Sequence, residues 1–177
     1  MINMKLIIVG KGASGKDWMQ KRIIEKGYAS MKQYTTRKKR DNELGDEYHF
    51  IDNVEFKDME KSGKFVSVNF YRIGWYGISL DELKSCDVAI LSPANIIEIF
   101  SAYPELRKEY KIVYLDIPID VRRHRLSRRY VNNIGDDNEV RIMNDENDFK
   151  DFCDYDVKLC SEDEVCDFIN TITPKLK

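Results

Sequence analysis

One segment near the N-terminus constrains the fold of this chain more than any other. An apolar run over residues 6–9 ends at Gly10. After four intervening residues comes the pair Gly15-Lys16, and a helical pattern follows over residues 18–26. This order of strand, glycine-rich loop and helix is that of a P-loop, in which backbone N–H groups and a helix N-terminus converge on a polyphosphate. The segment therefore predicts an α/β fold with a phosphate-binding loop after its first strand.

The last position of this loop departs from the usual pattern. A P-loop ends in Ser or Thr, whose hydroxyl holds Mg²⁺, whereas this chain has Asp17. The preceding Lys16 would reach the β- and γ-phosphates of a nucleotide. The alternative is an ordinary glycine-rich turn in a βα unit. We expect the phosphate site to consist of Gly10, Lys11, Gly12, Ala13, Ser14, Gly15, Lys16 and Asp17.

The composition is that of a folded protein without an overall attraction to nucleic acid. The 177 residues are 42% hydrophobic, which fits one domain with a sizeable core. The 29 basic and 31 acidic residues give a net charge of -2, so we expect no strong nucleic-acid binding. Monomer and homodimer remain open.

Cysteine usage and the N-terminal sequence indicate a cytoplasmic protein. The four cysteines show neither a C-x-x-C pair nor zinc-ligand spacing, so we expect them to be reduced. The first apolar run leads straight into the loop, and it is too short for a signal peptide or a membrane span. We therefore expect no membrane association.

Further strands and helices alternate along the chain, which favours a parallel sheet covered on both faces. We expect strands at residues 65–70, 87–92, 111–116 and 155–160, and helices at 52–60, 96–100, 120–129 and 161–172. The last helix begins with Ser161 three residues before Glu164, which predicts a capping box.

Two regions interrupt this alternation. Residues 33–80 are rich in Tyr, Phe, Thr and Gly, and we interpret them as an insert with a second binding surface. The polar stretch 130–148 is interpreted as a flexible lid beside an arginine-rich helix. One domain over residues 1–177 is therefore expected, with a core (1–32, 81–124, 149–177), the insert (33–80) and a lid (125–148).

Within the insert, Arg37 and Arg40 lie three residues apart and Tyr48 follows. Two guanidinium groups and a phenol hydroxyl suit a terminal phosphate, which accepts several hydrogen bonds. Taken alone, the same residues also fit a solvated basic turn.

The segment from Thr35-Thr36-Arg37 through Arg40 to Tyr48-x-Phe50 resembles the guanylate kinase signature. The resemblance continues through Phe65, Trp75-Tyr76-Gly77, Arg125-Leu126 and Asp148-Phe149, and so covers most of the chain. It implies an ATP-dependent nucleoside monophosphate kinase with a three-layer P-loop NTPase fold, an inserted NMP-binding subdomain and a helical lid. Arg37, Arg40, Tyr48 and Tyr76 would then hold the acceptor phosphate, with Gln33 where the family has a serine.

The helix at 120–129 and the polar stretch after it supply lid arginines. Arg125 and Arg129 lie four apart and share a helical face, and Arg141 resembles the arginine of the family's lid. Arg125 would bind ATP, and Arg129 and Arg141 would act in catalysis with Lys16 and Arg40 by neutralising charge on the transferred phosphoryl group. The alternative is a solvated basic face, to which we assign Arg122, Arg123 and Arg128.

The chain departs from the family where guanine is recognised. The family reads guanine with a Glu and with a Ser or Thr after Tyr-Gly, and the corresponding positions are Ser67 and Ile78. A carboxylate accepts two hydrogen bonds from guanine, whereas a serine offers one hydroxyl and an isoleucine none. The acceptor base is therefore open, with a pyrimidine, a modified base and relaxed specificity as alternatives to GMP.

A second departure concerns the metal. Family members carry acidic residues after the second strand, where this chain has Ser92, so we hypothesise that Asp17 has taken over Mg²⁺ or its waters. Two other functions stay open. One is an inactive guanylate-kinase-like module that binds a phosphorylated protein, and the other is a kinase for a nucleotide within a polynucleotide or for another small metabolite.

Overall fold

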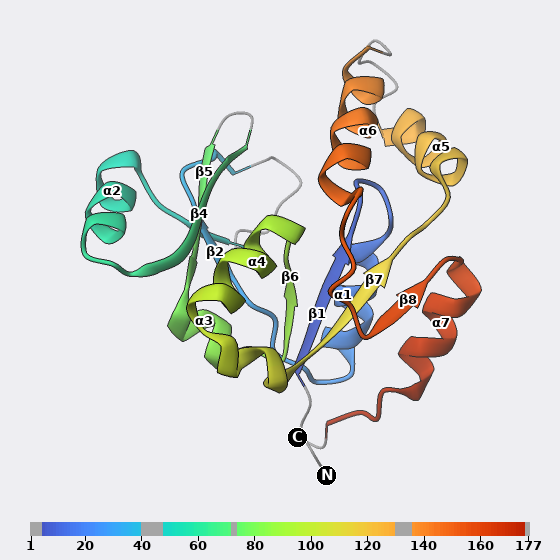
Figure 1. The fold of residues 1–177 in the computed structure, drawn as a ribbon, viewed down its shortest axis with the longest axis horizontal. Coiled ribbons are helices and arrows are strands. Elements are labelled where there is room, and N and C mark those ends of the chain that lie inside the picture. Colours follow the sequence, from blue (N-terminus) through green and yellow to red (C-terminus); the bar gives the residue numbers. More distant parts are fainter. Residues whose placement is uncertain (1–4, 40–47, 72–73, 130–135, 176–177) are drawn as a thin grey trace.

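The computed structural model describes residues 5–39, 48–71, 74–129 and 136–175, and it contains two sheets side by side (Figure 1). In the described part, the first sheet has four parallel strands in the order β6-β1-β7-β8: β6 (Val88–Ile90), β1 (Lys5–Gly10), β7 (Tyr110–Leu115) and β8 (Val157–Leu159). The alternation of strands and helices in the sequence thus gave the correct sheet type.

Side chains that alternate along β1 supply two cores on opposite faces of this sheet. Leu6 and Ile8 pack with Met19 and Ile23 of α1 (Lys16–Glu25) and with α7 (Glu162–Thr171). Ile7 and Val9 enter the other core, with side chains of α3 (Leu80–Ser85), α4 (Pro93–Ala102) and η1 (Pro104–Glu109). The three layers predicted from the sequence are therefore present.

The second sheet is mixed and is made by residues from the expected insert. Its order is β3-β2-β5-β4, with β3 (Tyr48–Phe50), β2 (Gln33–Thr35), β5 (Gly74–Ser79) and β4 (Phe65–Tyr71). The helix α2 (Asn53–Lys61) covers one face through Phe56, which packs against Phe65 and Trp75. The other face carries Tyr76, Ser67 and Asn69 and is turned toward α4 (Figure 1).

A register irregularity between Phe65 and Ser67 decides which side chains share this second face. Phe65 lies over Gly77, since a Cβ at that glycine would be 2.8 Å from the Phe65 ring. After the irregularity, Ser67 lies opposite Ile78 and Asn69 opposite Tyr76. The bulge therefore places Phe65 on the α2 side and Ser67 on the opposite side.

The expected lid contains more regular structure than its polar sequence suggested. The helix α5 (Ile119–Arg129) is followed by α6 (Asp136–Phe149), and both stand beyond the carboxyl ends of the parallel strands (Figure 1). The proposed boundary between residues 124 and 125 falls inside α5. Residues 130–135 lie outside the described part.

The predicted capping box at α7 forms only in part. Ser161 Oγ accepts from the Glu164 N–H at 3.2 Å, but the Glu164 carboxylate accepts from the Cys160 N–H at 2.6 Å instead of from Ser161. A complete capping box occurs at α4, where Ser92 and Asn95 bond reciprocally. In the described residues, no helix is both long and apolar enough to cross a membrane.

Candidate active site

The glycine-rich loop follows β1 and leads into α1 with a backbone that only small residues permit. Gly15 has φ +100° and Ala13 has φ +60°, both in the left-handed region. A Cβ at Gly10 would lie 2.6 Å from Ser14 Oγ and 2.9 Å from the Leu115 carbonyl oxygen. The buried Ser14 hydroxyl has no hydrogen-bond partner among the described residues. The loop therefore has the tight curvature expected of a phosphate cradle.

Lys16 is folded back over this loop. Its Nζ donates to the carbonyl oxygens of Gly10 at 2.6 Å and Lys11 at 2.9 Å. Burial lowers the pKa of Lys16 from 10.5 to about 8, and the nearby charge of Asp17 opposes this shift only in part. The Lys16 ammonium is thus held by two carbonyl oxygens in a buried site that lowers its pKa. A bound anion would stabilise its charged form.

The helix α6 brings acidic groups onto the loop. The Gly12 N–H donates to Asp145 Oδ2 at 2.8 Å, and Lys11 Nζ donates to Glu146 Oε2 at 2.7 Å. A Cβ at Gly12 would lie 2.9 Å from Arg141 Nε, so this lid arginine also reaches the loop. A carboxylate and an arginine therefore meet where the loop would receive phosphates.

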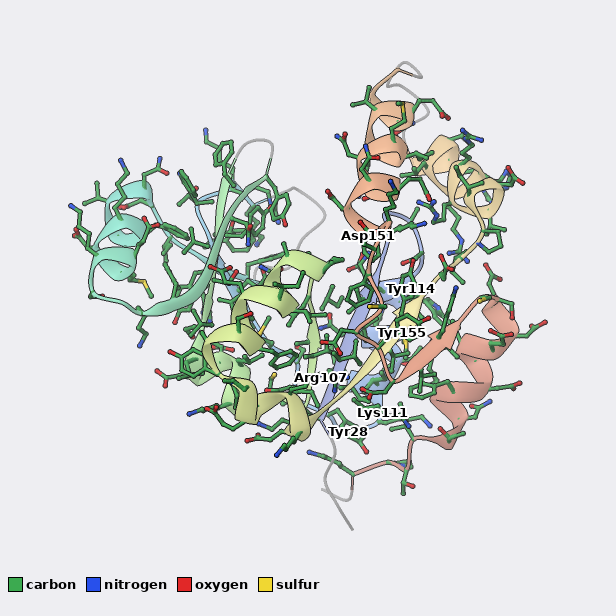
Figure 2. The ribbon with its side chains drawn as sticks, viewed as in Figure 1. Tyr28, Arg107, Lys111, Tyr114, Asp151 and Tyr155 are labelled. Carbon is green, nitrogen blue, oxygen red and sulfur yellow. The ribbon has the colours of Figure 1, made fainter. Side chains whose placement is uncertain are left out.

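Aromatic side chains hold the C-terminal end of α6 against the parallel sheet. The rings of Tyr114 and Phe149 stack with centroids 5.6 Å apart, and Phe152 and Tyr155 each lie 5.5 Å from Tyr114. Figure 2 shows Tyr114 and Tyr155 below the end of α6. These contacts fix the base of the helix that carries Asp145 and Arg141.

The prediction that Arg122 belongs to a solvated face is wrong. Its side chain is 1% exposed, and it bonds the Ile117 carbonyl oxygen at 3.1 Å and the Glu146 carboxylate. Its Nη1 lies 3.8 Å from Asp145 Oδ2 without a hydrogen-bond partner in the described part. The sequence suggested exposure because it does not show that α6 places two carboxylates over this face of α5.

The charges around Glu146 favour its ionised form. Burial acts to raise its pKa, but the hydrogen bond from Lys11 and the charge of Arg122 outweigh burial and hold the pKa below its ordinary value. Arg123, in contrast, is exposed and pairs with Glu139 at 2.8 Å, as a solvated face predicts. α5 therefore has one buried and one exposed basic face.

The structure describes the side chain of only one of the two remaining lid arginines, Arg125 and Arg129. Arg125 Nη1 donates to the Ala13 carbonyl oxygen of the loop at 2.8 Å, and its second nitrogen pairs with Glu162. The side chain of Arg129 lies outside the described part, as does Arg40 of the insert. The structure thus brings Arg125 and Arg141 to the loop from two sides.

A second cationic group lies on the mixed sheet. Arg37 is 4% exposed, and its Nε donates to the Tyr76 hydroxyl at 3.0 Å. Its guanidinium carbon lies 5.2 Å from the centre of the Tyr48 ring and 5.4 Å from that of Phe50. The sequence predicted that Arg37, Tyr48 and Tyr76 act together, and the structure does place them in contact.

The positions expected to face the base are neutral. Ile78 is 2% exposed and belongs to the core. Gln33, which was expected at the acceptor phosphate, donates through Nε2 to the Ile90 carbonyl oxygen at 3.3 Å. Ser67 is 1% exposed and accepts from Asn95 Nδ2 at 2.8 Å. Asn95 was not predicted as a site residue, although its place three residues after Ser92 and before a helical pattern is a capping signal.

Comparison with known proteins identifies the family of this chain. Residues 3–169 match the family model of guanylate kinase. The chain belongs to the guanylate kinase family. It is 25% identical over 167 residues to a guanylate kinase of Bdellovibrio bacteriovorus, covering 89% of this chain and 88% of that protein.

A solved guanylate kinase structure shares the fold. The crystal structure of guanylate kinase from Anaplasma phagocytophilum superposes with a TM-score of 0.64 and covers 96% of this chain and 82% of that one, at 14% identity. The predicted family and fold class are therefore confirmed. Guanylate kinases are phosphotransferases that bind nucleotides, and the activity of this member is considered below.

The two positions considered for a metal, Asp17 and Ser92, both lie at helix N-termini. Asp17 is exposed in the first turn of α1 beside Lys16, and its carboxylate has no hydrogen bond or ion pair with other described residues. Ser92 is occupied as the N-cap of α4, since its Oγ donates to Asn95 Oδ1 at 2.7 Å. Mg²⁺ binds through one or two carboxylates together with substrate phosphates and water, so Asp17 fits that donor set and Ser92 does not.

Proposed function

We propose that this protein transfers the γ-phosphoryl group of ATP to a nucleoside or deoxynucleoside monophosphate. The observation that supports the proposal is that one fold holds two separate cationic groups, each of a kind suited to a phosphate. One is the glycine-rich loop with Lys16, and the other is Arg37 with Tyr76 and Tyr48. A kinase for phosphorylated acceptors needs both, because each substrate brings its own negative charge to the reaction.

At the donor site, the loop amides and the N-terminus of α1 would hold the ATP phosphates. A phosphate of ATP would replace Asp145 as the acceptor of the Gly12 N–H. Lys16 would exchange its hydrogen bonds to the two carbonyl oxygens for contacts with the β- and γ-phosphates. Arg141 already lies beside Gly12, so it would neutralise charge on the transferred group, with Arg129 as a second lid arginine. Arg125 would hold the loop through the Ala13 carbonyl.

Mg²⁺, when bound, supplies charge neutralisation between the phosphates. Asp17 would hold the ion or its waters, because its carboxylate lies at the start of α1 beside Lys16 and is not bonded to any other residue in the described part. This chain would therefore take its metal carboxylate from the loop.

At the acceptor site, Arg37 would donate to the monophosphate while Tyr76 and Tyr48 hold the guanidinium plane. Arg40 would add a second guanidinium group. The acceptor phosphate is already anionic near neutral pH, so the reaction needs alignment and charge neutralisation and no general base.

A coupled assay with Mg-ATP and a panel of ribo- and deoxynucleoside monophosphates tests this function. We expect turnover with at least one acceptor, loss of turnover in Lys16→Ala, and a raised KM for the acceptor in Arg37→Lys, which keeps the charge but loses the planar fork. Absence of turnover with the whole panel would refute the proposal.

One observation favours a second function, an inactive module that binds a phosphorylated protein. Asp145 occupies the Gly12 amide, and Lys16 bonds loop carbonyls, so the loop is closed by the protein's own groups. Mg-ATP binding that is lost in Lys16→Ala supports the kinase. Binding of a phosphopeptide without any ATP binding supports the module.

A further inference from the structure

A chain of neutral polar side chains runs from the start of α4 to the mixed sheet. The Ser92 N–H and Ser92 Oγ both donate to Asn95 Oδ1, at 3.1 and 2.7 Å. Because a backbone N–H can only donate, the Asn95 amide has a fixed orientation, and its Nδ2 must face Ser67 at 2.8 Å. Asn95 is 6% exposed and Ser67 1%, so this part of the chain is closed to solvent.

The next member, Asn69, does not have a fixed orientation. Its amide lies 3.2 Å from Ser67 Oγ. The Ser67 hydroxyl already accepts one hydrogen bond from Asn95, so it can still accept one more and donate one. Ser67 can therefore accept from Asn69 Nδ2 or, after a flip of the amide, donate to Asn69 Oδ1.

Asn69 is also the accessible member of the chain and lies beside the acceptor-phosphate group. It is half-buried, and it pairs with Tyr76 across the antiparallel strands β4 and β5. Directly paired residues point to the same face of a sheet, and the Tyr76 hydroxyl bonds Arg37 on that face. A nucleotide whose phosphate binds Arg37 would thus have Asn69 and Ser67 along its path toward α4.

We propose that Asn69 contacts the base of the acceptor nucleotide, and that Ser67 lets its amide present either a carbonyl or an amino group, so that more than one base is accepted. This inference rests on the proposed function. It deepens that function by naming the contact and the substrate class, which is monophosphates with both amino-edged and carbonyl-edged bases.

The chemistry of the base edges supports this assignment. Adenine and cytosine present an amino donor beside a ring-nitrogen acceptor, whereas guanine and uracil or thymine present a carbonyl beside a ring N–H. An amide matches the first pair in one orientation and the second pair in the other. A carboxylate, which only accepts, would match donors alone.

The test measures kcat/KM for AMP, CMP, GMP and UMP and their deoxy forms at saturating Mg-ATP, with calorimetric binding of the same monophosphates. Binding needs no phosphoryl transfer, so it separates this inference from the proposed function. For the native protein we expect the best amino-edged and the best carbonyl-edged nucleotide to lie within about tenfold of each other. If the amide were fixed in one orientation, the kcat/KM values of these two nucleotides would differ by about 5- to 150-fold.

Asn69→Asp fixes the contact as an acceptor. Uracil and cytosine each present one donor to a carboxylate, whereas guanine presents two, its ring N–H and its 2-amino group. We therefore expect GMP to gain at least tenfold in affinity relative to UMP and CMP, mainly through KM, with the KM for ATP unchanged. The matched control is Asn170→Asp, an exposed residue of α7, which adds the same charge and should leave the base ratios unaltered. Should Asn69→Asp fail to fold, Asn69→Ala is expected to weaken all bases and to compress their differences.

Each outcome decides between the two proposals. Binding of both base classes without turnover keeps this inference and refutes the kinase. Turnover with one base class preferred by more than about tenfold, or unchanged ratios in Asn69→Asp, refutes this inference and keeps the kinase. Absence of binding by any monophosphate refutes both.

Discussion

The lowered pKa of Lys16 predicts that ATP binding depends on pH in a range where an ordinary lysine does not titrate. The ammonium form binds phosphate, and in the free protein this form is lost as the pH rises through about 8. The affinity for ATP should therefore be greatest below pH 8 and should fall above it. A lysine at its ordinary pKa of 10.5 would remain charged over the same range.

The size of this effect follows from proton linkage. With a pKa of about 8 in the free protein, about 10% of Lys16 is neutral at pH 7 and about 90% at pH 9. If bound ATP keeps the lysine charged, its dissociation constant should rise about tenfold between these pH values. At pH 8 about half a proton should be taken up for each ATP bound.

Isothermal titration calorimetry measures both quantities. Titrations of Mg-ATP at pH 7, 8 and 9, in two buffers of different ionisation enthalpy, give the affinity and the proton uptake. Lys16→Arg is the control, because a guanidinium stays charged throughout and its affinity should not change with pH. Equal affinities at pH 7 and 9 in the native protein, with no proton uptake at pH 8, would show that the buried lysine does not control binding.

Three further substitutions test the contacts around the two proposed phosphate sites. Asp145→Ala frees the Gly12 N–H and should tighten Mg-ATP binding about tenfold in a fluorescence titration. The control Asp148→Ala, at an exposed position on the same helix, should leave the affinity unchanged. Weaker binding by Asp145→Ala would contradict the idea that Asp145 and ATP compete for the Gly12 N–H. Gly74→Ala places a Cβ 2.8 Å from the backbone nitrogen of Arg37, so the KM for the acceptor should rise at least tenfold while the KM for ATP stays the same. Arg122→Met leaves the carboxylates of α6 without their buried partner. It should lower the free energy of unfolding, measured by urea denaturation, by about 3 kcal/mol. A decrease under about 1 kcal/mol would mean that the pairing contributes little to stability.

The parts of the fold that the sequence predicted depend on local patterns. The loop after β1 follows from a short apolar run, two glycines and a lysine within a few positions, and the strands and helices that pack on β1 follow from their own periodicity. The insert was predicted because its composition interrupts the alternation of strands and helices, and its residues form the mixed sheet. It also carries the ordered signature of Thr-Thr-Arg, Tyr-x-Phe and Tyr-Gly. Arg37 and Tyr76 could be paired in advance because both belong to that ordered signature.

Other parts escaped prediction because they depend on which distant side chains meet. Asn69 looked like one polar residue in a strand, and only the bulge after Phe65 and the cap at Ser92 connect it with Asn95. The acidic residues of α6 looked like part of a polar lid. Their role appears only where the helix crosses the loop.

Local sequence patterns specify a glycine-rich loop at the end of a buried strand and an arginine-tyrosine signature on an insert. These features are encoded by residue types at short spacing, so no long-range information is needed to recognise them. The tertiary structure alone decided that Asp145 takes the Gly12 amide and that Arg122 is buried beneath the lid. The physical reason is that burial and charge pairing depend on the approach of α5 and α6 to each other and to the loop, which the spacing of residues along one helix cannot specify.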